Sequence, residues 1–189
     1  MPPKSRISRE MILDSSIKVV RNKGIQNLNV RAIATELKCS TQPIMYHFAT
    51  MEELKSEIYD MISEEHFHSL MNIDLQASKE PCVELCRNYI RYAVAEPNLF
   101  RFLYQTDRFT SERLNSSWAL PKLTEFMTVL AELYSLNPEQ AQQVFSVSLL
   151  AAHGLACFLA NNTVTYNEDI ANLLIRSVLT GCSVELKQD

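Results

Sequence analysis

The sequence is poor in glycine, with only Gly24, Gly154 and Gly181 among its 189 residues. All-β sandwiches and barrels need glycine for their many tight turns, so this scarcity argues against them. The three glycines also lie far apart, which excludes a glycine-rich loop that cradles a nucleotide phosphate. The most apolar stretch, residues 144–160, is broken by two serines, a histidine and a glycine. We therefore expect a helix buried in protein there, and no membrane association.

Cysteine is present in an odd number, five, and the first ten residues, MPPKSRISRE, lack the apolar core of a signal peptide. This combination predicts free thiols and a cytoplasmic protein. Cys82 and Cys86 are four residues apart, so they share one face of a helix. We interpret them as small core residues and keep thiol sensing as the alternative.

Acidic residues are scarce in the N-terminal part of the chain, and basic residues are the minority in the rest. Residues 1–50 carry eight Lys/Arg against three Asp/Glu, whereas residues 51–189 carry ten against nineteen. The net charge of −4 hides this asymmetry. A basic N-terminal segment joined to an acidic remainder favours a nucleic-acid-binding head on a body that does not bind nucleic acid.

The chain has the pattern of helices throughout, without the period-two alternation of strands. Three N-terminal helices are indicated by N-cap residues at Ser8, Asn29 and Ser40, and Gly24 marks the end of the first. A fourth, long helix begins near Thr50, where Glu52 and Glu53 favour its N-terminus. Further helices are expected over about 81–96, 97–106, 119–134, 138–161 and 168–184. Asn137, Pro138 and Glu139 form a strong start signal for the fourth of these.

The second and third helices are separated by a short turn, which describes a helix-turn-helix. Ala34 is small enough for the crossing of the two helices, and Cys39 supplies a compact side chain in the turn. Thr41, Gln42 and Tyr46 on the third helix are of the right type to reach base edges, since glutamine can pair with adenine and a threonine methyl can meet thymine.

Residues 24–54, GIQNLNVRAIATELKCSTQPIMYHFATMEEL, resemble the DNA-binding head of the TetR family of transcriptional regulators. The residues that match the family pattern are Gly24, Val30, Arg31, Ile33, Ala34, Ser40, His47, Phe48 and Leu54. The departures are Lys38 for the turn glycine, Met45 for the usual tyrosine of the recognition helix, and Met51 for the lysine that opens the fourth helix. These departures predict an altered operator preference or weaker non-specific binding.

The resemblance implies an all-α fold with a three-helix DNA-binding head, residues 1–49, and a helical bundle for effector binding and dimerisation, residues 50–189. The expected DNA-binding residues are Asn29, Arg31, Ser40, Thr41, Gln42, Pro43, Met45, Tyr46 and His47. Arg6, Arg9 and Lys38 are further candidates for phosphate contacts.

The body is rich in aromatic side chains, and a pocket between bundle helices is a common site for a small apolar ligand. The expected effector-binding residues are Tyr89, Tyr92, Phe100, Tyr104, Phe126, Phe145, Leu149 and His153. The last two long helices have an apolar excess that predicts a homodimer through a four-helix bundle. The expected interface residues are Val144, Val147, Ala151, Leu155, Leu174 and Val178.

The sequence thus predicts a cytoplasmic, homodimeric regulator that binds a palindromic double-stranded DNA operator and is released by a small apolar or amphipathic effector. Two alternatives are a DNA-binding regulator without an effector, and a helical ligand carrier or enzyme with a vestigial head. Glu64 and His68 have the spacing of a ligand pair, but the sequence has neither an HExxH motif nor a nucleophile elbow. We therefore expect no catalytic residue, no cofactor and no metal.

Overall fold

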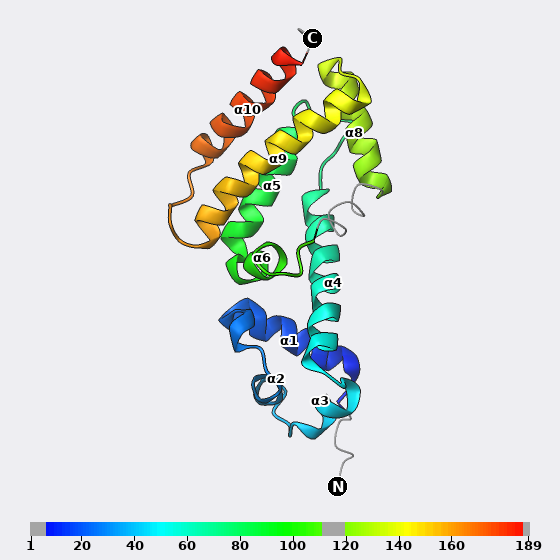
Figure 1. The fold of residues 1–189 in the computed structure, drawn as a ribbon, viewed down its shortest axis with the longest axis vertical. Coiled ribbons are helices and arrows are strands. Elements are labelled where there is room, and N and C mark those ends of the chain that lie inside the picture. The colour runs from blue at the N-terminus through cyan, green and yellow to red at the C-terminus, as the bar shows by residue number, and fades with distance from the viewer. Residues whose placement is uncertain (1–6, 111–119, 187–189) are drawn as a thin grey trace. The chain divides into compact units, whose positions relative to one another are not determined.

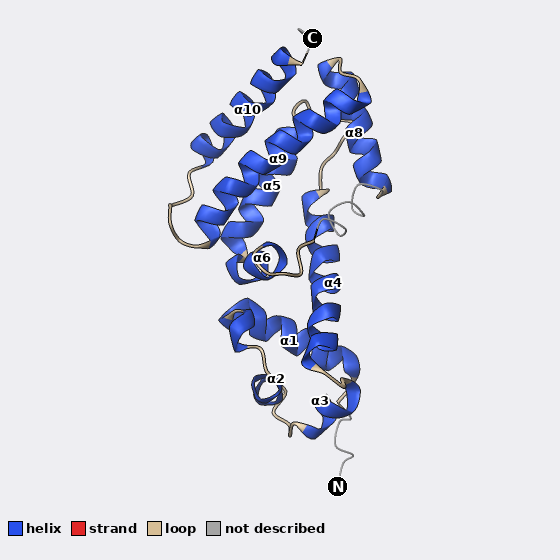
Figure 2. Ribbon diagram, viewed as in Figure 1, coloured by secondary structure: helices blue, strands red, loops and turns tan. Residues whose placement is uncertain are grey.

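The computed structural model describes residues 7–110 and 120–186, and every regular element in these residues is a helix (Figures 1 and 2). This confirms the all-α prediction. The elements are α1 (Arg9–Lys23), the short 3₁₀ turn η1 (Ile25–Asn27), α2 (Val30–Glu36), α3 (Gln42–His47), α4 (Met51–Leu70), α5 (Pro81–Ala95), α6 (Pro97–Tyr104), α8 (Pro121–Tyr134), α9 (Pro138–Ala160) and α10 (Glu168–Glu185).

The N-terminal helices begin and end close to the residues that the sequence predicts. Ser8 caps α1 by accepting the Met11 N–H, and α1 ends at Gly24, whose φ of +80° suits a residue without a side chain. Asn29 caps α2, because its Oδ1 accepts the Ala32 N–H at 3.0 Å. The predicted cap of α3 is wrong by one residue, since Thr41 precedes the helix and gives it no side-chain hydrogen bond.

The start of α9 combines three signals that the sequence displays. Asn137 Oδ1 accepts the Gln140 N–H at 2.9 Å, and Gln140 Oε1 accepts the Asn137 N–H at 3.0 Å, which completes a capping box around Pro138. Gln140 also donates to the Leu186 carbonyl at 2.7 Å, which ties the first turn of α9 to the end of α10.

The chain divides into two compact units. The first comprises residues up to 65 together with 98–106, and the second comprises 66–97 and the rest from 107. The first unit therefore extends beyond the predicted head of residues 1–49, and that boundary stays a prediction. Its core includes Ile12, Ile33, Ile44, Leu54 and Ile58, all essentially inaccessible to solvent.

Short helix α6 belongs to the first unit although it follows the second unit's α5 in sequence. The Tyr59 hydroxyl on α4 donates to the Leu103 carbonyl at 3.1 Å, and the Tyr59 and Phe102 rings meet edge to face at 5.6 Å. Asn98 donates to the Arg21 carbonyl at 2.8 Å. These contacts attach α6 to both α4 and α1.

In the second unit, α5, α9 and α10 lie side by side, and α8 packs against α9 (Figure 1). Three ion pairs join α10 to α5 and its start, and Arg87 contributes the longest of them, at 3.9 Å from Glu168. Arg176 forms two hydrogen bonds with the Glu80 carboxylate, at 2.9 and 2.6 Å, and Arg91 contacts Glu168 at 2.8 Å. Glu80 directly precedes α5, so both ends of α5 are fastened.

Helix α9 is the one helix in the described residues that is long and apolar enough to cross a membrane by length and composition alone. It has 23 residues, and its most apolar window has a mean hydropathy of 1.7 and is 39% buried. A core helix passes the same test. The contacts of α9 with α5, α8 and α10 account for its buried side.

Candidate nucleic-acid interface

Helix α3 is anchored by one side chain and presents most of the others to solvent. Ile44 is 1% exposed and holds α3 to the core, as Ile33 and Ala34 hold α2. On the outer face of α3, Tyr46 is 77% exposed and Met45 is 67% exposed, and Gln42 is exposed beside them. A six-residue helix held by its inner side chain therefore displays a mixed polar and apolar face.

This outer face offers the chemistry that base edges recognise. Gln42 carries an amide that can both donate and accept, Tyr46 carries a hydroxyl, and Met45 offers an apolar contact of the kind that meets a thymine methyl. Ser40 is exposed in the turn before α3, and Thr41 and Pro43 are half-buried at its start. The structure thus brings the predicted recognition residues onto one short segment.

At the start of α2, Arg31 and Asn29 differ in their freedom to contact DNA. Arg31 is exposed, so its guanidinium is available to a phosphate. Asn29 Oδ1 is used as the helix cap, and its amide donates to the Asn27 carbonyl at 3.2 Å. Asn29 therefore has a structural role that the sequence also indicates.

The turn between α2 and α3 contains Lys38 in the left-handed region, with φ of +53°. This is the position where the TetR pattern has glycine, which adopts that conformation without cost. Lys38 is exposed and keeps its positive charge near α3 in the chain. Lys38 thus adopts the left-handed conformation that a glycine at this position of a turn would adopt.

Arg9 was predicted as a phosphate contact, and the structure gives it another role. It forms an ion pair with both oxygens of the Glu57 carboxylate, lies 3.3 Å from Glu53, and stacks over the Phe48 ring at 4.4 Å. The hydrogen bond to Glu57 raises the pKa of Arg9 above its usual value. Its charge therefore links α1 to α4 within the first unit.

Glu53 and His47 extend this link to the end of α3. Glu53 accepts the Ala49 N–H at 3.1 Å, directly after α3. His47 Nε2 lies 3.1 Å from the carbonyl oxygen of Ile7, two residues before α1, so the ring contacts the chain within the first unit rather than only facing outward. Arg6 lies outside the described residues. Contacts between residues forty or more positions apart leave no periodic signal in the sequence, so sequence reasoning missed these pairs.

The second unit brings three of the predicted effector residues together with one that was not predicted. The Tyr89 hydroxyl and His153 Nδ1 are 2.8 Å apart, between α5 and α9. His66, on the last turns of α4, stacks on Tyr92 with ring centroids 3.9 Å apart and lies 5.7 Å from the Tyr89 ring. The sequence pattern assigns no effector role to His66.

Burial sets the protonation of these two histidines. It lowers the pKa of His66 to about 3 and also lowers the pKa of His153. Both imidazoles are therefore neutral near pH 7, and the cluster offers uncharged donors and acceptors among aromatic rings. No group of three or more potential ligands in the described residues is placed to hold a metal ion.

The other predicted effector residues fall into two places. Phe126 and Phe145 pack edge to face at 5.3 Å inside the second unit, and Leu149 is half-buried on α9. Phe100 and Tyr104 pair with each other at 5.0 Å in the first unit. The structure therefore does not gather all eight residues within one unit.

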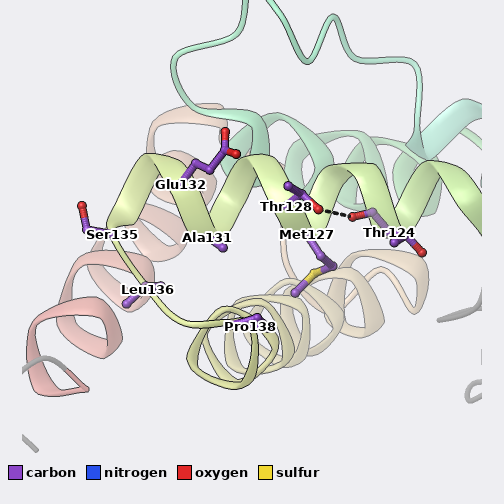
Figure 3. Close-up of a pocket in the computed structure, with 8 residues that line it drawn as sticks. All are labelled: Thr124, Met127, Thr128, Ala131, Glu132, Ser135, Leu136 and Pro138. Atoms are coloured by element: carbon purple, nitrogen blue, oxygen red, sulfur yellow. Dashed lines mark hydrogen bonds between the residues drawn. The ribbon is translucent and has the colours of Figure 1, made fainter.

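A separate groove of about 520 Å³ runs along α8 and the start of α9 (Figure 3). Its lining is mainly apolar, with the Glu132 carboxylate at one side, and none of the predicted effector residues contributes to it. The lining residues are Thr124, Met127, Thr128, Ala131, Glu132, Ser135, Leu136 and Pro138.

The predicted interface residues differ in their access to a partner. Val147 is exposed, whereas Ala151, Leu155, Leu174 and Val178 are half-buried and Val144 is completely buried inside the unit. The apolar pattern that predicts the dimer also includes Ile170 and Leu173 on the last helix. The four most exposed apolar side chains on these two helices are more exposed than the six predicted interface residues. They are Leu150 (69% exposed) and Phe158 (55%) on α9, and Leu173 (67%) and Ile170 (60%) on α10.

Comparison with known proteins identifies the fold. No protein-family model matches the chain. A 102-residue segment is 28% identical to the probable HTH-type transcriptional regulator YttP of Bacillus subtilis, and the match covers 52% of this chain and about half, 49%, of that relative.

Solved structures match over most of the chain. A structure described as a TetR-family transcriptional regulator from Vibrio parahaemolyticus superposes with a TM-score of 0.63 at 17% identity, over 91% of this chain and 96% of that one. The multidrug binding protein EbrR, complexed with imidazole, gives 0.54 at 21%, over 90% and 88%. At this level of identity, the likeness shows that the chain has the fold of these proteins.

Proposed function

We propose that this protein is a sequence-specific DNA-binding transcriptional regulator of the TetR type, and that α3 is its recognition helix. The observation that carries the proposal is the outer face of α3, where Gln42, Met45 and Tyr46 are exposed while Ile44 fixes the helix in place. Exposure of large apolar and aromatic side chains to water is unfavourable, and contact with a binding partner removes that exposed apolar area.

The charge distribution supports DNA as that partner. Residues 1–50 carry a net charge of +5, although the whole chain is acidic. Arg31, in the first turn of α2, and Lys38, just after that helix, are exposed and available to phosphates. Phosphate contacts would fix the register of the head, while Gln42 and Tyr46 read the bases.

The proposal is tested by selecting bound DNA from a random pool and then measuring variants on the selected site. Tyr46→Ala and Gln42→Ala should each cost about 1–3 kcal/mol of specific binding, roughly 5- to 150-fold in Kd. Arg31→Ala should weaken all sequences alike and reduce the salt slope by about one.

Val94→Ala, at a side chain that is 43% exposed on α5, is the matched control and should leave Kd unchanged. If Tyr46→Ala and Gln42→Ala both bind the selected site as tightly as the control, α3 is not the recognition helix.

Homodimerisation through α9 and α10 is the second part of the proposal. Leu150 and Phe158 on α9, and Ile170 and Leu173 on α10, are more than half exposed, so a second copy would cover substantial apolar area. A two-fold axis would present two copies of α3 to a palindrome with half-sites about 34–36 Å apart.

Leu150→Glu should therefore give monomers with poor operator binding, and Val94→Glu should remain dimeric. Sedimentation measures both variants, and a folded wild-type monomer at micromolar concentration would contradict the dimer.

The third part is an uncharged, apolar or amphipathic effector that binds among Tyr89, Tyr92 and His153. Their neutral polar groups and aromatic rings suit such a ligand, and the name of the structurally similar EbrR describes a multidrug binding protein. The effector would act by favouring a different state of the dimer than DNA favours. Leu149→Trp, on the half-buried side of α9, should abolish effector response while operator binding persists.

We propose no enzymatic activity, no membrane association and a cytoplasmic location.

A further inference from the structure

The five cysteines occupy distinct environments. Cys82 and Cys86, the pair that the sequence singles out, are both completely buried on α5. A hydrogen bond with Cys82 and burial raise the pKa of the Cys86 thiol well above its usual value, which makes it a poor nucleophile. Cys39, Cys157 and Cys182 are half-buried and therefore accessible in part.

Cys157 differs from the other two accessible thiols by its contact with an imidazole. Its Sγ lies 3.4 Å from His153 Nε2, one turn earlier on α9. Cys39 Sγ instead donates to the Ser40 carbonyl at 3.2 Å. A nucleophile beside a base, with the base oriented by a third group, is the arrangement that activates thiols in proteins.

Tyr89 supplies that third group. Its hydroxyl is 2.8 Å from His153 Nδ1, and Tyr89 is 4% exposed, so it holds the ring from inside the unit. In the tautomer with the proton on Nδ1, that N–H donates to the Tyr89 oxygen and Nε2 accepts the thiol proton. Burial lowers the pKa of His153, so the ring is neutral at pH 7 and able to accept.

We propose that Cys157, with His153 and Tyr89, is a site of covalent addition to uncharged soft electrophiles of the α,β-unsaturated carbonyl class, such as enals and quinones. His153 Nε2 takes the thiol proton, and the sulfur forms a bond to the β-carbon. The electrons of the C=C bond move toward the carbonyl oxygen, and the α-carbon then gains the proton from the imidazolium or water. The net reaction adds S–H across C=C and needs no oxidant.

The surroundings select uncharged electrophiles. The sequence holds no charged residue between Glu139 and Glu168, so α9 beyond its first turn, including its last turn with Cys157, carries no cation that would attract an anionic disulfide.

The experiment uses N-ethylmaleimide, an uncharged α,β-unsaturated carbonyl probe, on the full chain at pH 7. Peptide mass spectrometry gives the rate at each cysteine. Cys157 should react at least about 10-fold faster than Cys182, which has similar partial exposure on α10. His153→Gln should remove that advantage and leave the rate at Cys182 unchanged, and Tyr89→Phe should reduce it in part.

Two results would overturn the proposal: a rate at Cys157 no higher than at Cys182 in the wild-type protein, or an unchanged ratio in His153→Gln. The buried Cys82 and Cys86 report on folding in the same spectra, since they are labelled only when the protein unfolds. If Cys82 and Cys86 are labelled in His153→Gln, that variant is unfolded and the test rests on the wild-type protein and Tyr89→Phe. A ratio of the Cys157 rate to the Cys182 rate that is the same in Tyr89→Phe as in wild type would then contradict the proposal.

Discussion

Replacing His66 with phenylalanine should make the protein less sensitive to acid. The His66 side chain is 2% exposed and stacks on Tyr92 at 3.9 Å, and burial lowers its pKa to about 3. An unfolded histidine titrates near pH 6.5. Between about pH 6.5 and 3 the unfolded chain therefore binds a proton at this residue that the folded chain does not bind. The contribution of His66 to the free energy of unfolding is therefore fully present above pH 6.5 and is lost as the pH falls toward 3.

The size of the effect follows from the two pKa values. Each pH unit in that window lowers the free energy of unfolding by about 1.4 kcal/mol. From pH 7 to pH 5 the loss due to His66 alone is about 2 kcal/mol. Phenylalanine keeps a flat ring against Tyr92 and removes the titration, so His66→Phe should lose about 2 kcal/mol less than wild type over the same interval.

Urea unfolding at pH 7 and pH 5, followed by circular dichroism, measures the difference. Carboxylates and the other histidines contribute equally to both proteins and cancel, as does any constant offset from the substitution itself. His68→Phe, at an exposed position on the same helix, is the matched control for the loss of one histidine. Parallel losses in wild type and His66→Phe would refute the conclusion that His66 is buried as a neutral ring.

Two further substitutions test the turn and the α5–α10 link. Lys38→Gly should raise the free energy of unfolding by about 1 kcal/mol, because φ of +53° strains a residue with a side chain. In a thermal melt the midpoint should rise by about 2–4 °C. An unchanged midpoint would argue against the left-handed conformation of this turn. Arg176→Gln should lower the free energy of unfolding only slightly at pH 7, since both Arg176 and its partner Glu80 are about half exposed to solvent. Arg176 lowers the pKa of Glu80, so this cost should disappear as the pH falls through that lowered pKa, and a cost that persists in acid would exclude the ion pair as its source.

The sequence by itself determined the helices and much of the recognition surface. Ser8, Asn29 and the Asn137–Pro138 start act through hydrogen bonds to residues within one turn, so their effect can be read locally. The exposure of Gln42, Met45 and Tyr46 follows from helical periodicity around the apolar Ile44, which the sequence also shows. The assignment of these residues to DNA contact stays a prediction.

Only the tertiary structure decided which distant side chains meet. The Arg9–Glu57 ion pair, the Tyr89–His153 hydrogen bond and the His66–Tyr92 stack each join separate helices, and no local pattern specifies such pairs. Burial has the same origin, because Val144 and Val147 look alike in sequence and differ only in what packs against each side of α9. The burial that lowers the pKa of His66 depends on this helix packing. The contacts of His153 with Tyr89 and Cys157 depend on it as well, so both features exist only in the folded chain.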